Sequence, residues 1–180
     1  MSEKSQDARK AAGSHWDRDS WNIEPDSIAL ALGALSPQTA GKVMREAFYG
    51  TRRFEDFQDR CGLSRGILAT RLSDLVAMDL LEKRPYRESG ARERHEYRLT
   101  DKGRSLAPAM IALTDWAAKW LVDPAGPTVT LTHRDCGAEV HAVIACEAGH
   151  QLGGVGEVAA LPGPGATPAA DFQSDDSAGS

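Results

Sequence analysis

The sequence predicts a mainly α-helical fold of the α+β class, with a small β extension toward the C-terminus. Three observations predict this fold. Apolar residues recur at helical spacing through most of residues 26–120. A glycine turn at residue 62 separates two helical segments, and a basic segment with the pattern of a β-hairpin follows over residues 80–99. After Gly126-Pro127 only short apolar runs remain.

The length of the chain sets the domain organisation that we expect. Its 180 residues suggest one principal domain with an appendage, or two small domains. Hydrophobic residues make up 41% and charged residues 26%, which are values typical of globular proteins. We expect an N-terminal tail over residues 1–25, a principal domain over 26–123, a small β-hairpin extension over 124–161 and a disordered tail over 162–180.

Several features favour a cytoplasmic protein without a membrane partner. No segment approaches the roughly 18 consecutive apolar residues of a membrane span, and the first twenty residues are too polar for a signal peptide. The three cysteines cannot all pair, and nothing indicates secretion, so a reducing compartment is the default expectation.

The distribution of charge matters more than the total. The formal net charge of −5 argues weakly against a nucleic-acid ligand. Residues 41–104, however, contain fifteen Lys and Arg against eleven Asp and Glu, whereas residues 105–180 contain two basic residues against nine acidic ones. A polyanion responds to the local charge of a surface, so the segment 41–104 is a candidate surface for nucleic acid.

The first helices are predicted from caps and apolar spacing. Asp26 is a plausible N-cap for an apolar helix that reaches Leu35. Ser36-Pro37 is expected to begin the next helix, with serine as the cap and proline in the first position. Gly50 is expected to end that helix.

The middle of the chain has the pattern of two helices followed by a hairpin. A short helix is expected over Phe54–Arg60, and Cys61-Gly62 forms the turn after it. Ser64 is expected to cap a helix that reaches about Asp79. Strands are expected over Leu80–Tyr86 and Glu96–Leu99, with a turn at residues 88–91 between them.

One final helix is expected from Thr100-Asp101 to Asp123-Pro124. Its apolar residues recur at helical spacing at Leu106, Met110, Leu113, Ala117 and Trp120. Beyond it, residues 129–132 and 140–145 have the pattern of two short strands.

Residues 54–100 therefore predict a winged helix-turn-helix, which is two helices around a glycine turn followed by a β-wing. The second helix would bury one face and leave its small, polar N-terminal turns free to enter a major groove. Arginines of the hairpin would neutralise neighbouring phosphates. The alternative is an ordinary surface helix and hairpin with solvated arginines. The candidate DNA contacts are Arg53, Ser64, Arg65, Gly66, Ala69, Thr70, Arg71, Arg87, Arg92 and Arg94.

An ordered set of residues covers positions 50–57, 62–64, 68–75, 80–86 and 96–100, together with Gly103, Leu106 and Trp116. This set, within about residues 26–122, resembles the HxlR family of winged-helix transcriptional regulators. The resemblance implies small bacterial homodimers that bind pseudo-palindromic operators, with the terminal helices forming the dimer. It also implies a recognition helix over Ser64–Arg71 and a wing over residues 84–98.

The chain departs from the family pattern in two places. Members usually carry Cys-Pro near the start of the first helix, where this chain has Asn22-Ile23-Glu24-Pro25. The Gly-Lys-Trp of the second helix is here Gly41-Lys42-Val43. The resemblance therefore does not support thiol sensing through the usual cysteine.

The last helix carries more apolar surface than a small winged-helix domain normally covers. These side chains could form intrachain core, but a two-fold partner is the usual solution. We therefore expect a homodimer. Its candidate contacts are Ile28, Leu32, Met110, Leu113, Trp116 and Trp120.

The C-terminal extension carries two Cys/His pairs, His133 with Cys136 and Cys146 with His150. Pairs of this kind on facing turns close zinc ribbons, so these four residues are a candidate zinc site. The alternative is a small hairpin without metal, in which case the protein has no cofactor. Cys61, beside the turn glycine, is expected to be a buried core residue.

These observations favour a regulator, expected to be a repressor, that binds a double-stranded DNA operator as a homodimer. A small-molecule effector could bind between the wings and the terminal helices. A winged helix that acts as a protein–protein adaptor is the alternative. An enzyme is not expected, because no carboxylate pair, Ser-His-Asp order or nucleotide loop is present. Cys136 and Cys146, ten residues apart, also have no flanking basic partner and are poor nucleophile candidates.

Overall fold

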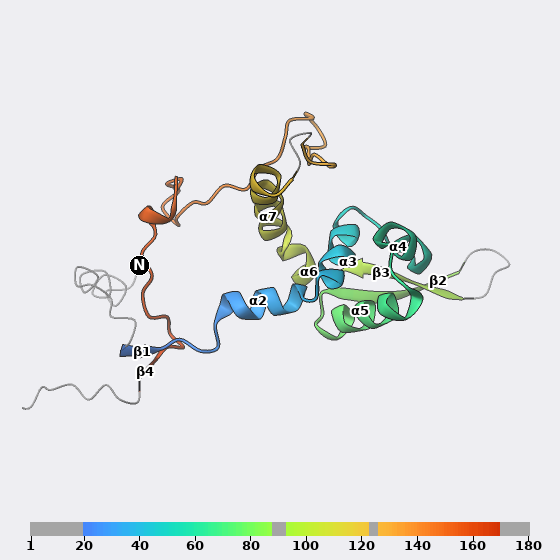
Figure 1. Ribbon diagram of the computed structural model, residues 1–180, viewed down its shortest axis with the longest axis horizontal. Coiled ribbons are helices and arrows are strands. Elements are labelled where there is room, and N and C mark those ends of the chain that lie inside the picture. The colour runs from blue at the N-terminus through green and yellow to red at the C-terminus, as the bar shows by residue number, and fades with distance from the viewer. Residues whose placement is uncertain (1–19, 88–92, 123–125, 170–180) are drawn as a thin grey trace, which may run out of the picture. The chain divides into compact units, whose positions relative to one another are not determined.

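The computed structural model describes residues 20–87, 93–122 and 126–169, which form two compact units. The larger unit spans Leu30–Val143, and the smaller unit contains the described residues before and after it. The division falls within helix α2 (Ser27–Leu35), which has no buried residue (Figure 1).

The larger unit is built around three helices and a two-stranded sheet. The helices are α3 (Gln38–Phe48), α4 (Phe54–Cys61) and α5 (Arg65–Ala77). The antiparallel strands are β2 (Leu81–Tyr86) and β3 (Arg94–Leu99). Together they enclose one core, whose largest fully buried side chains are Phe57, Met44, Leu68, Leu72, Leu75, Leu81 and Val43.

The first two helices begin differently, since a side chain caps α2 but not α3. The amide of Ile28 donates to Asp26 Oδ1 at 2.8 Å, which confirms Asp26 as the cap of α2. The expected cap of α3 is wrong by one residue, because Pro37 is the N-cap and no side chain caps that helix. Gly50, at φ 92°, follows the end of α3 as expected.

The turn between α4 and α5 matches the sequence expectation. Gly62 adopts the left-handed conformation at φ 64° and ψ 34°, which is costly for residues with a Cβ. Ser64 then caps α5 by accepting from the amide of Ile67 at 3.4 Å. Helix α5 ends at Ala77 rather than near Asp79, because Asp79 itself turns left-handed at φ 57°.

The hairpin is attached to the start of α4. Its register pairs Leu81 with Leu99 and Tyr86 with Arg94. The amide of Tyr97 donates to the carbonyl of Arg52 at 2.8 Å, so the base of the hairpin is bonded to the segment before α4. The expected turn at residues 88–91 lies outside the described residues.

The single final helix expected from the sequence is wrong. Two helices occur instead, α6 (Asp101–Ser105) and α7 (Ala107–Trp120), with a break at Leu106. Pro108 lies in the first turn of α7, and it has no amide hydrogen to donate to the preceding turn. The apolar spacing continues across this break, which is why periodicity alone does not reveal it.

The strands expected at residues 129–132 and 140–145 do not form. A short hairpin is present, with one bridge between Thr132 and Glu139 and a bond from the Val140 amide to the Leu131 carbonyl at 2.9 Å. The next amide that would continue the pairing, that of Ala142, donates instead to Asp115 Oδ2 of α7 at 2.9 Å. The extension is therefore anchored to a helix rather than extended as a sheet.

The smaller unit contains short elements only. Strand β1 (Trp21–Asn22) pairs with β4 (Thr167–Pro168), and a 3-10 turn, η2, spans Val155–Glu157. The expected tails thus contribute a strand each at Trp21–Asn22 and Thr167–Pro168, while residues 170–180 lie outside the described residues. In the described part of the chain, no helix has the length and apolar character needed to cross a membrane.

Candidate nucleic-acid interface

Helix α5 buries one side and exposes its N-terminal turns. Leu68, Leu72 and Leu75 are fully buried in the core. Ser64, Arg65, Gly66, Ala69 and Thr70 are all exposed. A methyl group added at Gly66 would meet nothing within 4 Å, so this turn is open. The structure therefore brings five of the predicted DNA contacts to one exposed helix start.

Arg65 is positioned by an aromatic ring of the preceding helix. Its guanidinium carbon lies 5.0 Å from the centroid of the Phe54 ring at the start of α4. A cation–π contact of this kind favours one orientation while the guanidinium hydrogens stay available for acceptors. Arg65 is thus a cation that is both exposed and restrained.

Thr70 has a narrower role than the sequence suggests. Its hydroxyl donates to the Gly66 carbonyl at 3.1 Å, a common bond between residues four apart in a helix. The hydroxyl oxygen therefore remains available as an acceptor.

Arg71 is placed differently from the other predicted contacts. It forms an ion pair with Asp74 at 2.7 Å, its side chain is 25% exposed, and its Nε is buried without a hydrogen-bond partner in the described structure. The residue lies beside the buried stripe of α5 rather than on the exposed face. We therefore leave Arg71 out of the group that could contact bases.

Three further predicted arginine contacts lie at the start of α4 and on the hairpin. Arg53 lies over the Tyr86 ring with its guanidinium carbon 5.1 Å from the centroid, which connects the start of α4 to the end of β2. Arg87 and Arg94 are exposed near the tip. Arg92 lies outside the described residues.

Two further exposed cations accompany this surface and were not singled out from the sequence. Arg52 directly precedes Arg53, and its carbonyl holds the wing through Tyr97. Lys83 lies on β2. The doubled Arg52-Arg53 and the run Lys83-Arg84 are the sequence signals that could have identified them.

A buried polar network connects α4 to α3. Glu46 of α3 is 6% exposed and accepts from Arg45 Nη2 at 2.9 Å and from the Thr51 hydroxyl at 3.1 Å. Arg60 of α4 donates to the same Thr51 hydroxyl oxygen at 2.9 Å. Since a buried carboxylate is costly without such partners, this network fixes α4 relative to α3. Sequence reasoning missed it because the partners come from three separate segments.

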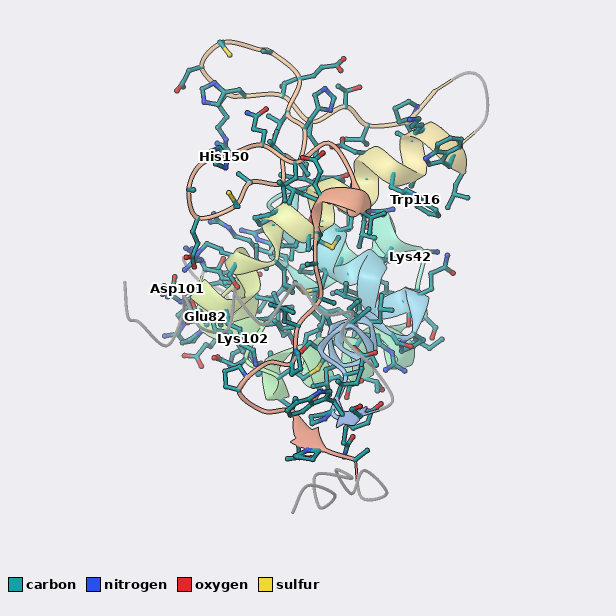
Figure 2. All side chains as sticks on the ribbon, turned by 90° about the vertical axis from the view of Figure 1, so that its left-hand side faces the viewer. Lys42, Glu82, Asp101, Lys102, Trp116 and His150 are labelled. Atoms are coloured by element: carbon teal, nitrogen blue, oxygen red, sulfur yellow. The ribbon has the colours of Figure 1, made fainter. Side chains whose placement is uncertain are left out.

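The candidate dimer contacts are exposed, with the exception of Met110. On α7, Leu113 is 48%, Trp116 54% and Trp120 63% exposed. Figure 2 shows Trp116 beside the ribbon of α7. Met110 is half-buried and lines a cavity instead. On α2, Ile28 is 71% and Leu32 57% exposed.

The cysteines fall into two classes. Cys61 is buried in the core, and burial raises the pKa of its thiol, with Glu46 adding to the effect. Such a thiol is held protonated and is a poor nucleophile. Cys136 and Cys146 are exposed.

The two Cys/His pairs are each formed locally. His133 Nδ1 lies 3.3 Å from Cys136 Sγ, and His150 Nδ1 lies 3.6 Å from Cys146 Sγ. The pairs belong to different units, and the described residues contain no group of three or more candidate ligands. The four-ligand zinc site stays a prediction, and the metal content of the purified protein tests it.

The exposed start of α5, the Gly62 turn and the attached hairpin define a winged helix-turn-helix. Residues 36–124 match the model of the HxlR-like helix-turn-helix family. The chain belongs to this family of transcriptional regulators.

Individual relatives agree with this assignment. The chain is 36% identical over 147 residues to an uncharacterized HTH-type transcriptional regulator of Mycobacterium tuberculosis, MT3179, covering 81% of this chain and 91% of that protein. The crystal structure of PA1607, a candidate transcription factor, aligns with a TM-score of 0.68 and 30% identity, covering 77% of this chain and 96% of that one. PA1374 of Pseudomonas aeruginosa, also a candidate transcription factor, aligns with a TM-score of 0.56 and 26% identity over 79% of this chain and 95% of that one.

Proposed function

We propose that the protein is a homodimeric repressor that binds an inverted-repeat operator in double-stranded DNA. The observation that carries the proposal is the division of α5 into a buried side and an open N-terminal start. A helix can enter the major groove only if its leading turns are unobstructed while its other face is anchored. The exposed Ser64, Arg65, Gly66, Ala69 and Thr70 meet the first condition, and the buried leucines meet the second.

Arg65 is the proposed base-reading residue. Arginine donates two parallel hydrogen bonds to the O6 and N7 acceptors of guanine, and the Phe54 ring restrains this side chain before DNA arrives. Because the Arg65 side chain is already restrained, it loses less conformational entropy when it binds DNA. Ala69 offers a methyl group for an apolar contact with thymine.

The wing supplies the sequence-independent part of the proposed interface. Arg87 and Arg94 are exposed on the wing, and Arg53 is exposed at the start of α4 beside it. Arg92 is a further predicted contact, and it lies outside the described residues. Cations of this kind bind phosphates and release counterions, which adds affinity without reading bases. The wing would thus fix the position of α5 on the duplex.

The exposed apolar face of α7 supports dimerisation with a second copy of the chain. Leu113, Trp116 and Trp120 would leave a large apolar patch in water if the protein were a monomer. Two-fold pairing would present two α5 helices to successive major grooves, about 34 Å or one DNA turn apart.

We propose that the protein represses transcription by occupying its operator. We also propose that it does so in the cytoplasm. A dimer that holds an operator overlapping a promoter excludes polymerase without any further contact. A reporter under such an operator should fall in expression when the protein is supplied, and a rise would show activation instead.

Selection of bound duplexes from a random pool tests the proposal. The full chain should enrich an inverted repeat, and Arg65→Ala should then weaken binding to the selected duplex by about 1–3 kcal/mol in an anisotropy titration. Arg134→Ala removes an exposed arginine of the C-terminal extension and serves as the matched control. Binding no tighter than to competitor DNA would favour the protein–protein adaptor.

A further inference from the structure

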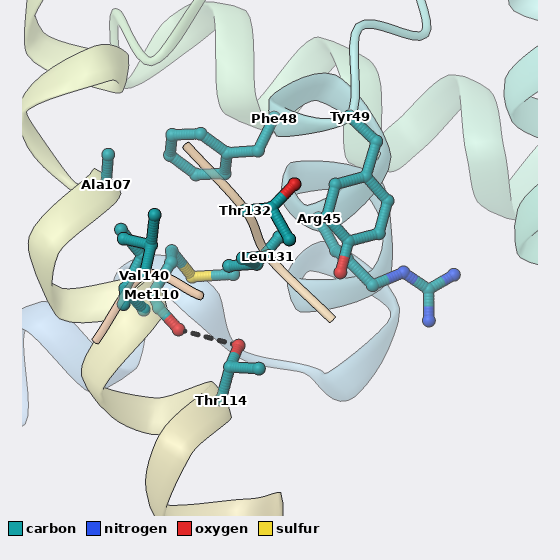
Figure 3. A pocket seen from close by; sticks show the side chains of 10 residues that line it. Arg45, Phe48, Tyr49, Ala107, Met110, Thr114, Leu131, Thr132 and Val140 are labelled. Atoms are coloured by element: carbon teal, nitrogen blue, oxygen red, sulfur yellow. Dashed lines mark hydrogen bonds between the residues drawn. The ribbon is translucent and has the colours of Figure 1, made fainter. Parts of the chain in front are cut away.

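A cavity lies in the larger unit, and none of the proposed DNA contacts lines it. It has a volume of about 240 Å³ and lies between the end of α3, the first turns of α7 and the short hairpin at residues 131–140. Figure 3 shows Phe48 and Tyr49 on the α3 side and Met110 and Val140 on the opposite side. An effector was expected between the wings and the terminal helices, whereas this cavity is lined by α7 and by no residue of the wing.

The third wall of the cavity comes from the C-terminal extension and is fixed to α7. Asp115 accepts from the Ala142 amide at 2.9 Å and lies 3.3 Å from His141 Nδ1. The bond from the amide lowers the pKa of the Asp115 carboxyl, in keeping with a carboxylate that holds the hairpin in place. These contacts hold Leu131 and Val140 over the opening, beyond the segment that matches the family model.

The lining is apolar and electrically neutral. Arg45 is its one charged side chain, and the carboxylate of Glu46 at 2.9 Å compensates that charge. The Thr114 hydroxyl already donates to the Met110 carbonyl at 2.9 Å (Figure 3). The hydroxyls of Tyr49 and Thr132 make no hydrogen bond within the described part of the chain, so they are available to a ligand. Such a lining penalises an anion and accepts a neutral molecule with one polar group.

We propose that this cavity is an effector site for a neutral, compact ring compound with a single hydroxyl, carbonyl or N–H group. Its size supports this class, because an engineered cavity of about 150 Å³ lined by apolar side chains binds benzene. A volume of about 240 Å³ therefore holds one ring with substituents or two fused rings.

The position of the cavity links ligand binding to DNA binding. This link rests on the proposed function. One wall is the helix proposed to dimerise, and another is α3, which packs on α5. A ligand between them alters how α7 sits on the DNA-binding core, and so the separation of the two α5 helices in the dimer. We expect occupancy to change operator affinity by about 5-fold or more.

Methyl NMR with indole, a neutral two-ring probe, tests occupancy directly. The methyl signals of Met110 and Ile111, which line the cavity, should shift and saturate, while those of Met78 and Ile67, which do not, stay in place. Benzoate, an anion of similar size, should shift them far less. Absence of saturable shifts at Met110 and Ile111, or equal shifts with benzoate, would overturn the proposal.

Two variants separate the cavity from the exposed face of α7. Ala107→Phe places a ring in the cavity and should abolish the indole shifts, whereas Ala109→Phe, at an exposed position on the same helix, should preserve them. Shifts that persist unchanged in folded Ala107→Phe would place indole elsewhere and overturn the assignment. If Ala107→Phe fails to fold, Ala107→Leu fills part of the cavity and should weaken indole binding, and unchanged binding by that variant would overturn the assignment.

The regulatory step is measured separately. Indole should change the affinity for the selected duplex in the parent protein and in Ala109→Phe, but not in Ala107→Phe. Saturated Met110 and Ile111 shifts with unchanged duplex affinity would overturn the effector role. Failure to bind any duplex selectively would instead contradict the proposed function and leave the cavity result standing.

Discussion

Single side chains at the start of α5 determine what the helix can present to DNA. Arg65 is exposed and stacked on Phe54, and Thr70 uses its hydroxyl hydrogen within the helix. Gly66 leaves the surface beside them without a side chain. The proposed recognition surface therefore depends on one restrained cation and on small neighbours that leave room around it.

Gly66→Ala should separate stability from DNA binding. The added methyl meets nothing within 4 Å, and alanine is favoured over glycine in a helix by about 1 kcal/mol, so the free energy of unfolding should rise. The same methyl occupies space that the proposed interface gives to DNA, so affinity for the selected duplex should fall. Denaturant unfolding and anisotropy measure the two effects on one sample.

The control for this prediction is Gly103→Ala, where a Cβ would collide with the Leu80 carbonyl oxygen and only loss of stability is expected. Equal or tighter duplex binding by a stabilised Gly66→Ala variant would contradict the proposed role of this turn.

Among the elements, the wing and α5 are expected to contribute to binding in different ways. The wing is attached to the start of α4 through the Tyr97 amide and through Arg53 on Tyr86. Its cations face phosphates in the proposed complex, and phosphates carry no sequence information. Changes in the wing should therefore alter affinity without altering sequence preference.

Arg94→Ala should weaken binding to the selected duplex and to a scrambled duplex by the same factor. One phosphate contact fewer in each subunit should reduce the slope of log K against log salt by about one per subunit. Anisotropy titrations at several salt concentrations measure the slope. An unchanged slope, or a loss confined to the selected duplex, would show that Arg94 does not contact phosphate as proposed.

Local sequence signals predicted the helix-turn-helix, since Ser64, Gly62 and the leucine spacing act within a few residues. The same spacing also indicates that Arg71 lies beside the buried leucines rather than on the exposed face. Arg71 follows Leu68 by three residues and precedes Leu75 by four. The break at Leu106 was missed because the apolar residues keep their helical spacing on both sides of Pro108. The anchoring of Ala142 on Asp115 joins residues 27 apart in the chain, and no local pattern indicates such a contact.

For the whole molecule, the exposed apolar face of α7 is the feature that a monomer does not explain. Trp116 and Trp120 are more than half exposed, and aromatic side chains are frequent energetic centres of interfaces. A dimer would bury them and would also give the DNA-binding surface the two-fold symmetry of an inverted repeat.

Trp116→Glu should convert the dimer to a monomer at micromolar concentration. Placing a carboxylate in a buried interface, together with loss of the indole ring, should cost about 2 kcal/mol or more of association free energy. Light scattering coupled to size exclusion measures the mass, with Thr130→Glu, at an exposed position on the C-terminal extension, as the charge-matched control. A monomeric parent protein, or a variant that stays dimeric, would contradict the proposed interface.

In the proposed complex, the start of α5 reads bases in each half of a symmetric operator. Parallel selections from one random pool, with the parent chain and with Arg65→Ala, test it most directly. We predict that both proteins enrich inverted repeats of the same spacing, and that the variant loses its preference at one position in each half-site. Identical motifs from the two proteins would contradict the claim, because they would show that Arg65 does not read the sequence.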